Sequence, residues 1–209
     1  DGLIVENMHD APYIHGDHGP ETTAAMTRIA LAVRAAVGPK MLMGVQVLSG
    51  GNREALAVAL AAGCRFIRCE NFVFAHVADE GLLARAEAGP LLRYRRHIGA
   101  AHIAIFCDLK KKHASHAITA DISLADAAEA AEFFGADGLI VTGAATGKPT
   151  HPDDVAEVRA ATRLPVLVGS GVTADTVAEL FTHADALIVG SSIKRGGHWA
   201  NPIDKARCQ

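Results

Sequence analysis

The chain has 209 residues, half of them hydrophobic, and a formal net charge of -3 at pH 7. Its one basic run, Lys110-Lys111-Lys112, is too short to form the positive face that nucleic-acid binding needs, so we expect no nucleic-acid partner. No apolar stretch approaches the roughly 20 residues of a membrane helix, so we expect no transmembrane segment. The four cysteines show no Cys-x-x-Cys spacing. They are typical of reduced thiols, and we expect a cytoplasmic protein.

Short apolar runs alternate along the chain with segments of helical periodicity. The predicted strands, in chain order, are Leu3–Glu6, Leu42–Leu48, Phe66–Cys69, Ile103–Cys107, Leu139–Thr142, Val166–Gly169 and Ala186–Gly190. The predicted helices are Glu21–Val37, Arg53–Ala62, Leu124–Phe134, Asp153–Ala161 and Thr173–Thr182. Asn52, Ser123 and Thr173 stand where an N-cap side chain would accept the first free amide hydrogens. Strict alternation of strand and helix predicts a parallel sheet.

One five-residue sequence motif occurs three times, as DGLIV at 1–5, DGLIV at 137–141 and DALIV at 185–189. Such an apolar run is typical of a parallel strand that is covered on both faces. The second and third copies follow helical segments, whereas the first has nothing before it. We therefore expect that the first β/α unit of the repeating pattern is missing from this chain or is supplied from elsewhere.

The position of the glycine loops favours a closed barrel over a doubly wound sheet. A doubly wound sheet places G-x-G-x-x-G after its first strand, and that motif does not open a helix there. We predict an α/β fold, a single (β/α)₈ TIM barrel over residues 1–209 with seven of its eight strands visible. Because a barrel without its first strand has two open edges, we also expect a homo-oligomer.

Two late loops predict a phosphate site. Gly169-Ser170-Gly171 and Gly190-Ser191-Ser192 follow the last two strands, where TIM barrels commonly bind phosphate. Glycines let backbone amides approach an anion, and the N-terminus of the following helix would add its dipole. The alternative is a pair of tight turns that bind no ligand.

Four residues are candidates for acid–base catalysis at the strand ends: Glu6, Asp108, Lys112 and His113. Asp108 ends a strand, and the lysine and histidine follow it by four and five residues. The same group could instead form a metal ligand set, or a solvated loop in which Asp108 caps a turn. A lysine that forms a Schiff base with substrate is less favoured, because such lysines need burial.

Further polar residues at the same strand ends are predicted to contact a substrate. They are Asn7, Gln46, Glu70, Asn71, Thr142, Gly143 and Thr146. The repeated Glu-Asn pairs at 6–7 and 70–71 place two carboxylates around one substrate, or they form hydrogen bonds between neighbouring strands. The histidine-rich loop at 9–18 does not match a compact metal motif. No cofactor is therefore assigned, and a divalent metal remains open.

The ordered series of these phrases resembles the BtpA family, which is named for a protein needed for photosystem I biogenesis. The resemblance rests on Val5-Glu6-Asn7-Met8, Gly44-Val45-Gln46-Val47-Leu48, Asp108 with Lys112-His113, Val168-Gly169-Ser170-Gly171-Val172 and Val189-Gly190-Ser191-Ser192. It implies a phosphate-binding TIM barrel with one more strand and helix at its start. Glu70-Asn71 and Ser49-Gly50-Gly51 are positions at which subgroups of the family differ.

The resemblance leaves two main functions open. Family members beside sugar-utilisation genes imply carbohydrate metabolism, and hence an isomerase, epimerase or lyase that binds a phosphorylated small molecule. The photosystem role implies instead a non-catalytic assembly factor for a membrane complex such as photosystem I. The third hypothesis is a metal-dependent hydrolase or a nucleotide-related activity, with Asp10, Asp108 and the histidines as metal ligands.

Overall fold

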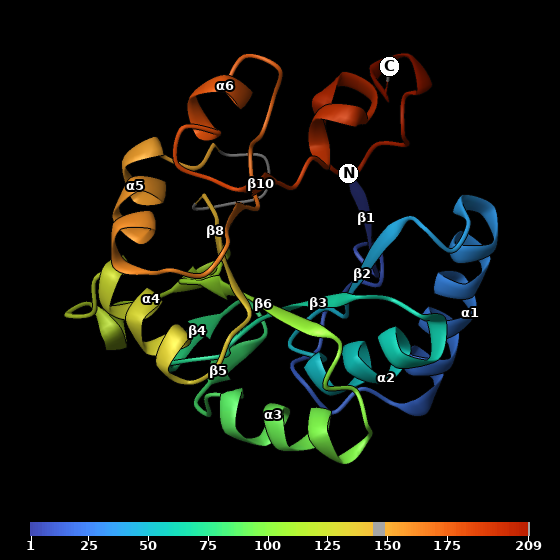
Figure 1. Cartoon of the computed structure of the whole chain (residues 1–209), viewed down its shortest axis with the longest axis horizontal. Helices are drawn as coiled ribbons and strands as arrows, with labels where there is room; N and C mark the ends of the chain where they lie inside the picture. Colours follow the sequence, from blue (N-terminus) through green and yellow to red (C-terminus); the bar gives the residue numbers. More distant parts are fainter. Residues whose placement is uncertain (144–148, 209) are drawn as a thin grey trace.

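The computed structural model of the chain describes residues 1–143 and 149–208. Seven strands form one parallel sheet in chain order. They are β1 (Gly2–Glu6), β2 (Leu42–Gln46), β3 (Phe66–Cys69), β6 (Ala104–Leu109), β8 (Gly138–Val141), β9 (Val166–Val168) and β10 (Ala186–Leu187). The sheet curves around a centre, and its helices lie on the outer side (Figure 1).

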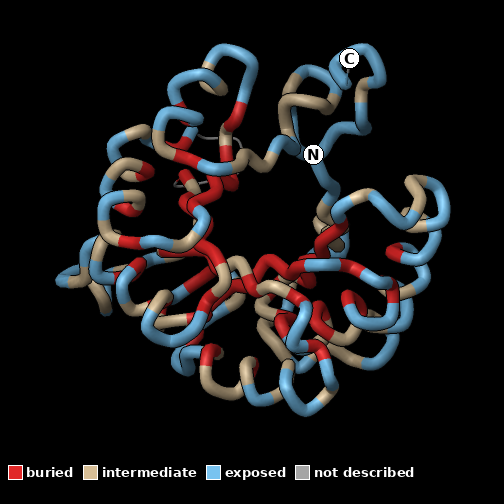
Figure 2. Tube along the Cα trace, viewed as in Figure 1, coloured by how far each residue is buried: buried red, intermediate tan, exposed pale blue. Residues whose placement is uncertain are grey.

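The outer layer consists of α-helices that connect successive strands. They are α1 (Pro20–Val37), α2 (Asn52–Ala62), α3 (Ala88–His97), α4 (Leu124–Phe133), α5 (Pro152–Ala161) and α6 (Val177–Leu180). Buried residues lie along the strands and on the inward faces of these helices (Figure 2). Within the described ranges, none of the helices combines the length and apolar character needed to cross a membrane.

The predicted α/β class and parallel barrel-like sheet are confirmed, and all seven predicted strands belong to it. The two ends of the strand order are β1 and β10, and the strand ladders of the described residues do not join them. The prediction of an eighth strand and of a homo-oligomer stays a prediction.

The chain also forms a second, smaller sheet and one helix that were not predicted from the sequence. The small sheet is antiparallel and contains β5 (Gly81–Leu83), β4 (His76–Ala78) and β7 (Ala114–Ser115), in that order. These short strands lie between β3 and α3 and after β6, outside the regular alternation of strand and helix on which the prediction rests. The missed helix is α3, whose ten residues include three arginines and a histidine and have little apolar character.

Ser123 is confirmed as an N-cap, whereas the other two predicted caps are wrong. The Ser123 hydroxyl accepts the Asp126 amide, and the Asp126 carboxylate accepts the Ser123 amide, which forms a capping box. Asn52 lies inside α2, and its side chain bonds the backbone of Glu70. The helix predicted to begin near Thr173 is only α6, and it begins at Val177.

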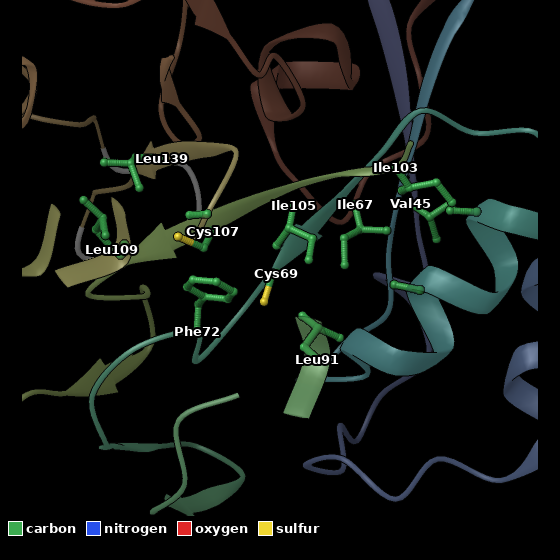
Figure 3. Packing of buried hydrophobic residues seen from close by; sticks show 14 of the residues in the cluster. Val45, Ile67, Cys69, Phe72, Leu91, Ile103, Ile105, Cys107, Leu109 and Leu139 are labelled. Carbon is green, nitrogen blue, oxygen red and sulfur yellow. The ribbon is translucent and has the colours of Figure 1, made fainter. Parts of the chain in front are cut away.

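The hydrophobic core lies between the sheet and its helices (Figure 3). Ile67, Cys69, Ile105 and Cys107 are fully buried on this side, where they meet residues of α3 such as Leu91. Since side chains alternate along a strand, Phe66 and Arg68 of β3 point to the opposite, concave side. The same holds for Phe106 and Asp108 of β6. The concave side therefore carries an aromatic layer below a charged layer.

The aromatic layer needs two glycines on neighbouring strands. The rings of Phe66 and Phe106 meet edge to face, with 5.5 Å between their centroids. A Cβ at Gly44 would lie 2.2 Å from the Phe66 ring, and one at Gly138 would lie 2.0 Å from the Phe106 ring. Any larger residue at either glycine would displace the phenylalanine that closes the bottom of the concave side.

The repeated aspartate has a structural role at two of its three positions. The Asp137 carboxylate accepts the Ile105 amide at 2.8 Å and pairs with Arg95 of α3 at 2.5 Å. Asp185 repeats this arrangement, accepting the Val166 amide at 2.8 Å and pairing with Arg159 at 2.9 Å. Each aspartate thus ties the start of one strand to the preceding helix.

We expect Asp137→Ala to lower the free energy of unfolding by about 1–3 kcal/mol, because it leaves the Ile105 amide and Arg95 without an acceptor. Urea unfolding measures the loss. Asp121→Ala, at an exposed position in a turn, is the matched control and should stay within about 0.5 kcal/mol. Equal effects of the two substitutions would contradict the structural role of the repeat.

Candidate active site

A buried ion pair occupies the centre of the concave side. Arg68 Nε lies 2.8 Å from Asp108 Oδ1, and Arg68 Nη2 lies 2.9 Å from Asp108 Oδ2. The two side chains are 4% and 1% exposed. The third nitrogen, Nη1, lies 3.6 Å from Glu6 Oε1. Burial by itself lowers the pKa of Arg68, but the charge and hydrogen bonds of Asp108 outweigh it, so the net pKa is raised and the guanidinium stays charged.

The loops after β9 and β10 enclose a cavity of about 140 Å³, which we call the loop cavity. Its lining residues from these loops and the chain that follows are Gly169, Ser170, Gly171, Val172, Thr173, Ile188, Gly190, Ser191, Ser192, Gly197 and Arg207. Glu6, Met8, Arg68 and Lys112 complete the wall. A Cβ at Gly169 would lie 3.2 Å from Arg68 Nη2, so the glycine leaves room for the guanidinium.

A second cavity of about 220 Å³, which we call the acidic cavity, lies beside the loop cavity. Four carboxylates line it: Glu6, Glu70, Asp79 and Glu80. The other lining residues are Met8, Tyr13, Gln46, Leu48, Arg68, Lys111, Lys112, His113 and Trp199. Because Glu6, Met8, Arg68 and Lys112 line both cavities, one ligand can extend from the first into the second.

Lys111 holds the wall of the acidic cavity together. Its Nζ lies 3.1 Å from the Ser49 hydroxyl, 3.3 Å from Glu70 Oε2 and 3.4 Å from Glu80 Oε1. Glu70 Oε2 also accepts the Ser49 hydroxyl at 3.1 Å and the Gly50 amide at 2.9 Å. Glu70 is therefore fixed by three donors, which leaves it little freedom to follow a substrate.

Lys112 lies at the junction of the two cavities. Burial, followed by the positive charge of Arg68, lowers the pKa of Lys112 below the ordinary lysine value, although the carboxylates of Asp108, Glu6 and Glu70 oppose the shift. A larger share of this amine is consequently neutral than for a lysine in water. A neutral amine beside a ligand cavity can accept a proton.

The chain after β10 folds back over both cavities. Trp199 stacks near His9 with 6.4 Å between ring centroids, and its carbonyl oxygen accepts the Lys194 ammonium. Lys194 Nζ also lies 3.4 Å from Met8 Sδ. Arg207 Nε donates to the Ser192 carbonyl at 2.7 Å. These contacts place an aromatic ring at the acidic cavity and a guanidinium at the loop cavity.

The structure brings most of the predicted site residues together. The six residues predicted for phosphate line the loop cavity, and five other predicted residues line the acidic cavity, namely Glu6, Gln46, Glu70, Lys112 and His113. The helix N-terminus expected to follow Gly171 is wrong, since α6 begins at Val177 and has four residues. The roles of the cavity-lining residues in binding and catalysis remain predictions.

Other predicted residues have contacts of a different kind. Asn7 accepts the Leu48 amide at 2.7 Å and donates to the Leu48 carbonyl, which joins the loops after β1 and β2. Asn71 donates to the Arg85 carbonyl at 2.6 Å. The Thr142 hydroxyl is buried and has no hydrogen-bond partner among the described residues, and Gly143 beside it is buried. Thr146 lies outside the described residues.

Arg68, Lys111 and Glu80 line the acidic cavity but were not predicted as functional residues from the sequence. A signal existed for Arg68, because a charge inside an apolar strand must find a partner when the strand is buried. Lys111 stands in a basic run that has the appearance of a solvated loop. Within the described parts of the chain, His, Cys, Asp and Glu side chains do not form a group of three placed to hold a metal ion.

We expect Arg68→Met to lower the free energy of unfolding by about 3–5 kcal/mol, because it leaves the Asp108 carboxylate buried without its partner. Replacing both partners, as Arg68→Met with Asp108→Leu, should recover most of that loss. Denaturant unfolding of the two single variants and the double variant provides the measurement. A double variant as unstable as Arg68→Met alone would show that the pair is not the source of the effect.

Comparison with known proteins gives matches over the whole chain. An uncharacterized mitochondrial protein of Caenorhabditis elegans is 46% identical over 210 residues, which covers 99% of this chain and 75% of that protein. The photosystem I biogenesis protein BtpA of Synechocystis is 36% identical over 209 residues, covering 99% of this chain and 71% of that protein.

Among solved structures, the orotidine 5′-phosphate decarboxylase of Pyrococcus horikoshii superposes with a TM-score of 0.57 at 15% identity. The match covers 87% of this chain and 76% of the decarboxylase chain. At that identity the likeness concerns the fold alone. The family model described as the BtpA family matches residues 1–209. The chain therefore belongs to the BtpA family.

Proposed function

We propose that this chain is an enzyme that binds a phosphorylated small metabolite and moves a proton on it, in an isomerase, epimerase or lyase reaction. One observation carries the proposal. The loop cavity, walled by two glycine loops and three cationic side chains, shares a wall with a cavity rich in carboxylates. Together the two cavities reach the size range of small-molecule sites, about 300–1,000 Å³.

The loop cavity suits a phosphate group on grounds of charge and shape. Arg68, Lys112 and Arg207 line it against one carboxylate, Glu6. Guanidinium groups match the geometry of phosphate oxygens, and glycine loops let backbone amides come close to an anion. The name of the Pyrococcus decarboxylase, which shares the fold, refers to a phosphorylated substrate.

The proton-transfer step would take place at the wall that the two cavities share. Glu6 and Lys112 both line this wall, so each can reach a carbon atom next to a phosphate held by the loops. A carboxylate and an amine of lowered pKa are groups that can remove and return a proton. Asp108, bound to Arg68, would act as a positioning residue rather than as the acid or base.

A second function has one specific observation in its favour. The Synechocystis relative is named a photosystem I biogenesis protein, and it aligns with 99% of this chain. A non-catalytic assembly factor would keep the barrel without needing ligand binding in the two cavities. The first of the following two experiments separates it from the enzyme, and the second tests the role of Lys112.

Inorganic phosphate and phosphate esters should raise the thermal unfolding temperature. A ligand at about 100 times its dissociation constant adds about 2.7 kcal/mol to the free energy of unfolding. A Cβ at Gly190 would meet no atom within 4 Å, so a side chain fits there. Gly190→Asp should abolish the effect through its charge, whereas Gly190→Asn, of equal size, should keep much of it.

An intact wild-type protein that responds to neither phosphate nor its esters would favour the assembly factor. Equal losses in Gly190→Asp and Gly190→Asn would show that the charge of the loop cavity does not decide binding.

Lys112 should react with an amine-labelling reagent at lower pH than a surface lysine does. Only the neutral amine reacts, and burial together with the charge of Arg68 lowers the pKa of Lys112 from an ordinary value of about 10.4. Mass spectrometry of labelled peptides across a pH series gives the midpoint for each lysine. Lys40, which is exposed, is the internal control. Identical midpoints for Lys112 and Lys40 would remove the neutral amine from the mechanism.

A further inference from the structure

The insertion after β3 brings an acidic turn to the acidic cavity. β4 and β5 form a hairpin whose two-residue turn is Asp79-Glu80, and both residues line the cavity. β7 pairs with the other side of β4, so the small sheet also fixes the chain that follows β6. In barrels of this type the loops that follow the strands determine which substrate is bound.

The Glu80 side chain is buried, and one of its two carboxylate oxygens has no partner among the described residues. The side chain is 7% exposed; Oε1 lies 3.4 Å from Lys111 Nζ, while Oε2 is buried and accepts no hydrogen bond from residues 1–143 or 149–208. Glu70, by contrast, has three donors on one oxygen. An unpaired oxygen on a buried carboxylate costs free energy, and a ligand that donates a hydrogen bond to it would recover that cost.

Glu80 stays ionised, so it can only accept hydrogen bonds. Burial raises the pKa of Glu80, but the nearby Ser49 hydroxyl, the Glu80 backbone and the positive charge of Lys111 outweigh burial, and the net pKa is lowered. A ligand group beside Glu80 must therefore be a donor.

The two cavities differ in charge. In the acidic cavity four carboxylates face Arg68, Lys111 and Lys112, whereas in the loop cavity Glu6 is the one carboxylate among the described lining residues, against three cations. A ligand that fills both cavities thus has an anionic end at the glycine loops. Its other end carries hydrogen-bond donors, and its carbon atoms pack against Tyr13 and Trp199, which also line the acidic cavity.

The ligand group that donates a hydrogen bond to Glu80 is better explained as a hydroxyl than as an ammonium group. Lys111 Nζ already lies within 3.4 Å of both Glu70 and Glu80. A second ammonium at Glu80 would be close to the first and would be repelled by it. A hydroxyl donates a hydrogen bond without that repulsion.

We infer that Glu80 is a specificity-determining residue, which accepts a hydrogen bond from a hydroxyl at the end of the ligand opposite the phosphate. The ligand class is accordingly a polyhydroxylated phosphate ester, such as a sugar phosphate. This inference rests on the proposed function, since it presumes that the loop cavity holds the phosphate.

The test compares affinities by calorimetry for inorganic phosphate, ethyl phosphate and a panel of triose, pentose and hexose phosphates. The tightest panel member should bind wild-type protein at least about 10-fold more tightly than ethyl phosphate, as expected for one hydrogen bond to a charged group. Glu80→Gln should lower this affinity ratio most of the way to 1 and leave the affinity for inorganic phosphate within about twofold of the wild-type value. Glu129→Gln, an exposed carboxylate on α4, is the matched control and should change neither value.

The outcomes distinguish failure of the role of Glu80 from failure of the proposed function. If wild-type protein binds none of these compounds, the proposed function fails, and this inference fails with it. If phosphate binds but Glu80→Gln leaves the ratio unchanged, only the role of Glu80 is overturned. If glucosamine 6-phosphate binds about 10-fold more tightly than glucose 6-phosphate, the group that donates to Glu80 is an ammonium group, and the assignment of a hydroxyl is wrong.

A second variant covers the case in which Glu80→Gln does not fold. Glu80→Asp keeps the charge that faces Lys111 but withdraws the carboxylate by one methylene group. The ratio is then expected to fall at least about threefold, since the hydrogen bond lengthens. A ratio equal to that of wild-type protein would contradict the inference.

Discussion

The ion pair between Arg68 and Asp108 sets the character of the concave side of the sheet. It places a guanidinium, held by two hydrogen bonds of 2.8 and 2.9 Å, above the ring layer of Phe66 and Phe106. Removing a charge of this kind from water is costly, and the carboxylate repays it only with good geometry. The remaining nitrogen of Arg68 is directed to Glu6, and the same guanidinium lines both cavities. The pair thus connects the packed lower part of the fold with the site above it.

The site is polarised from one end to the other. Arg68, Lys112 and Arg207 face the glycine loops after β9 and β10, whereas the carboxylates of the β4–β5 turn and of Glu70 after β3 line the acidic cavity. Lys112 and Glu6 lie where the two regions meet. Such an arrangement suits a ligand with one anionic end, and it places proton-carrying groups beside the middle of that ligand. The chain after β10 adds Trp199 and Arg207, one to each cavity.

The sequence predicted those parts of the structure that have a periodic or repeated pattern. All seven strands of the main sheet and the positions of both glycine loops were predicted correctly, because apolar runs and glycine pairs are local signals. The small antiparallel sheet was not predicted, since its short strands lie between β3 and α3 and after β6, outside the regular alternation of strand and helix. At the site, the environments of Asp108 and Glu80 could not be predicted from local sequence patterns either. Whether a carboxylate is bound to Arg68 or has an unpaired oxygen depends on neighbours 40 and 31 residues away in the chain.

A crystal structure of the protein with inorganic phosphate tests the central claim most directly. We predict one phosphate between residues 169–171 and 190–192, within hydrogen-bond distance of the Arg68 guanidinium and of backbone amides in both loops. A phosphate bound elsewhere, or an empty loop cavity at a concentration of phosphate that saturates the thermal response, would contradict the account.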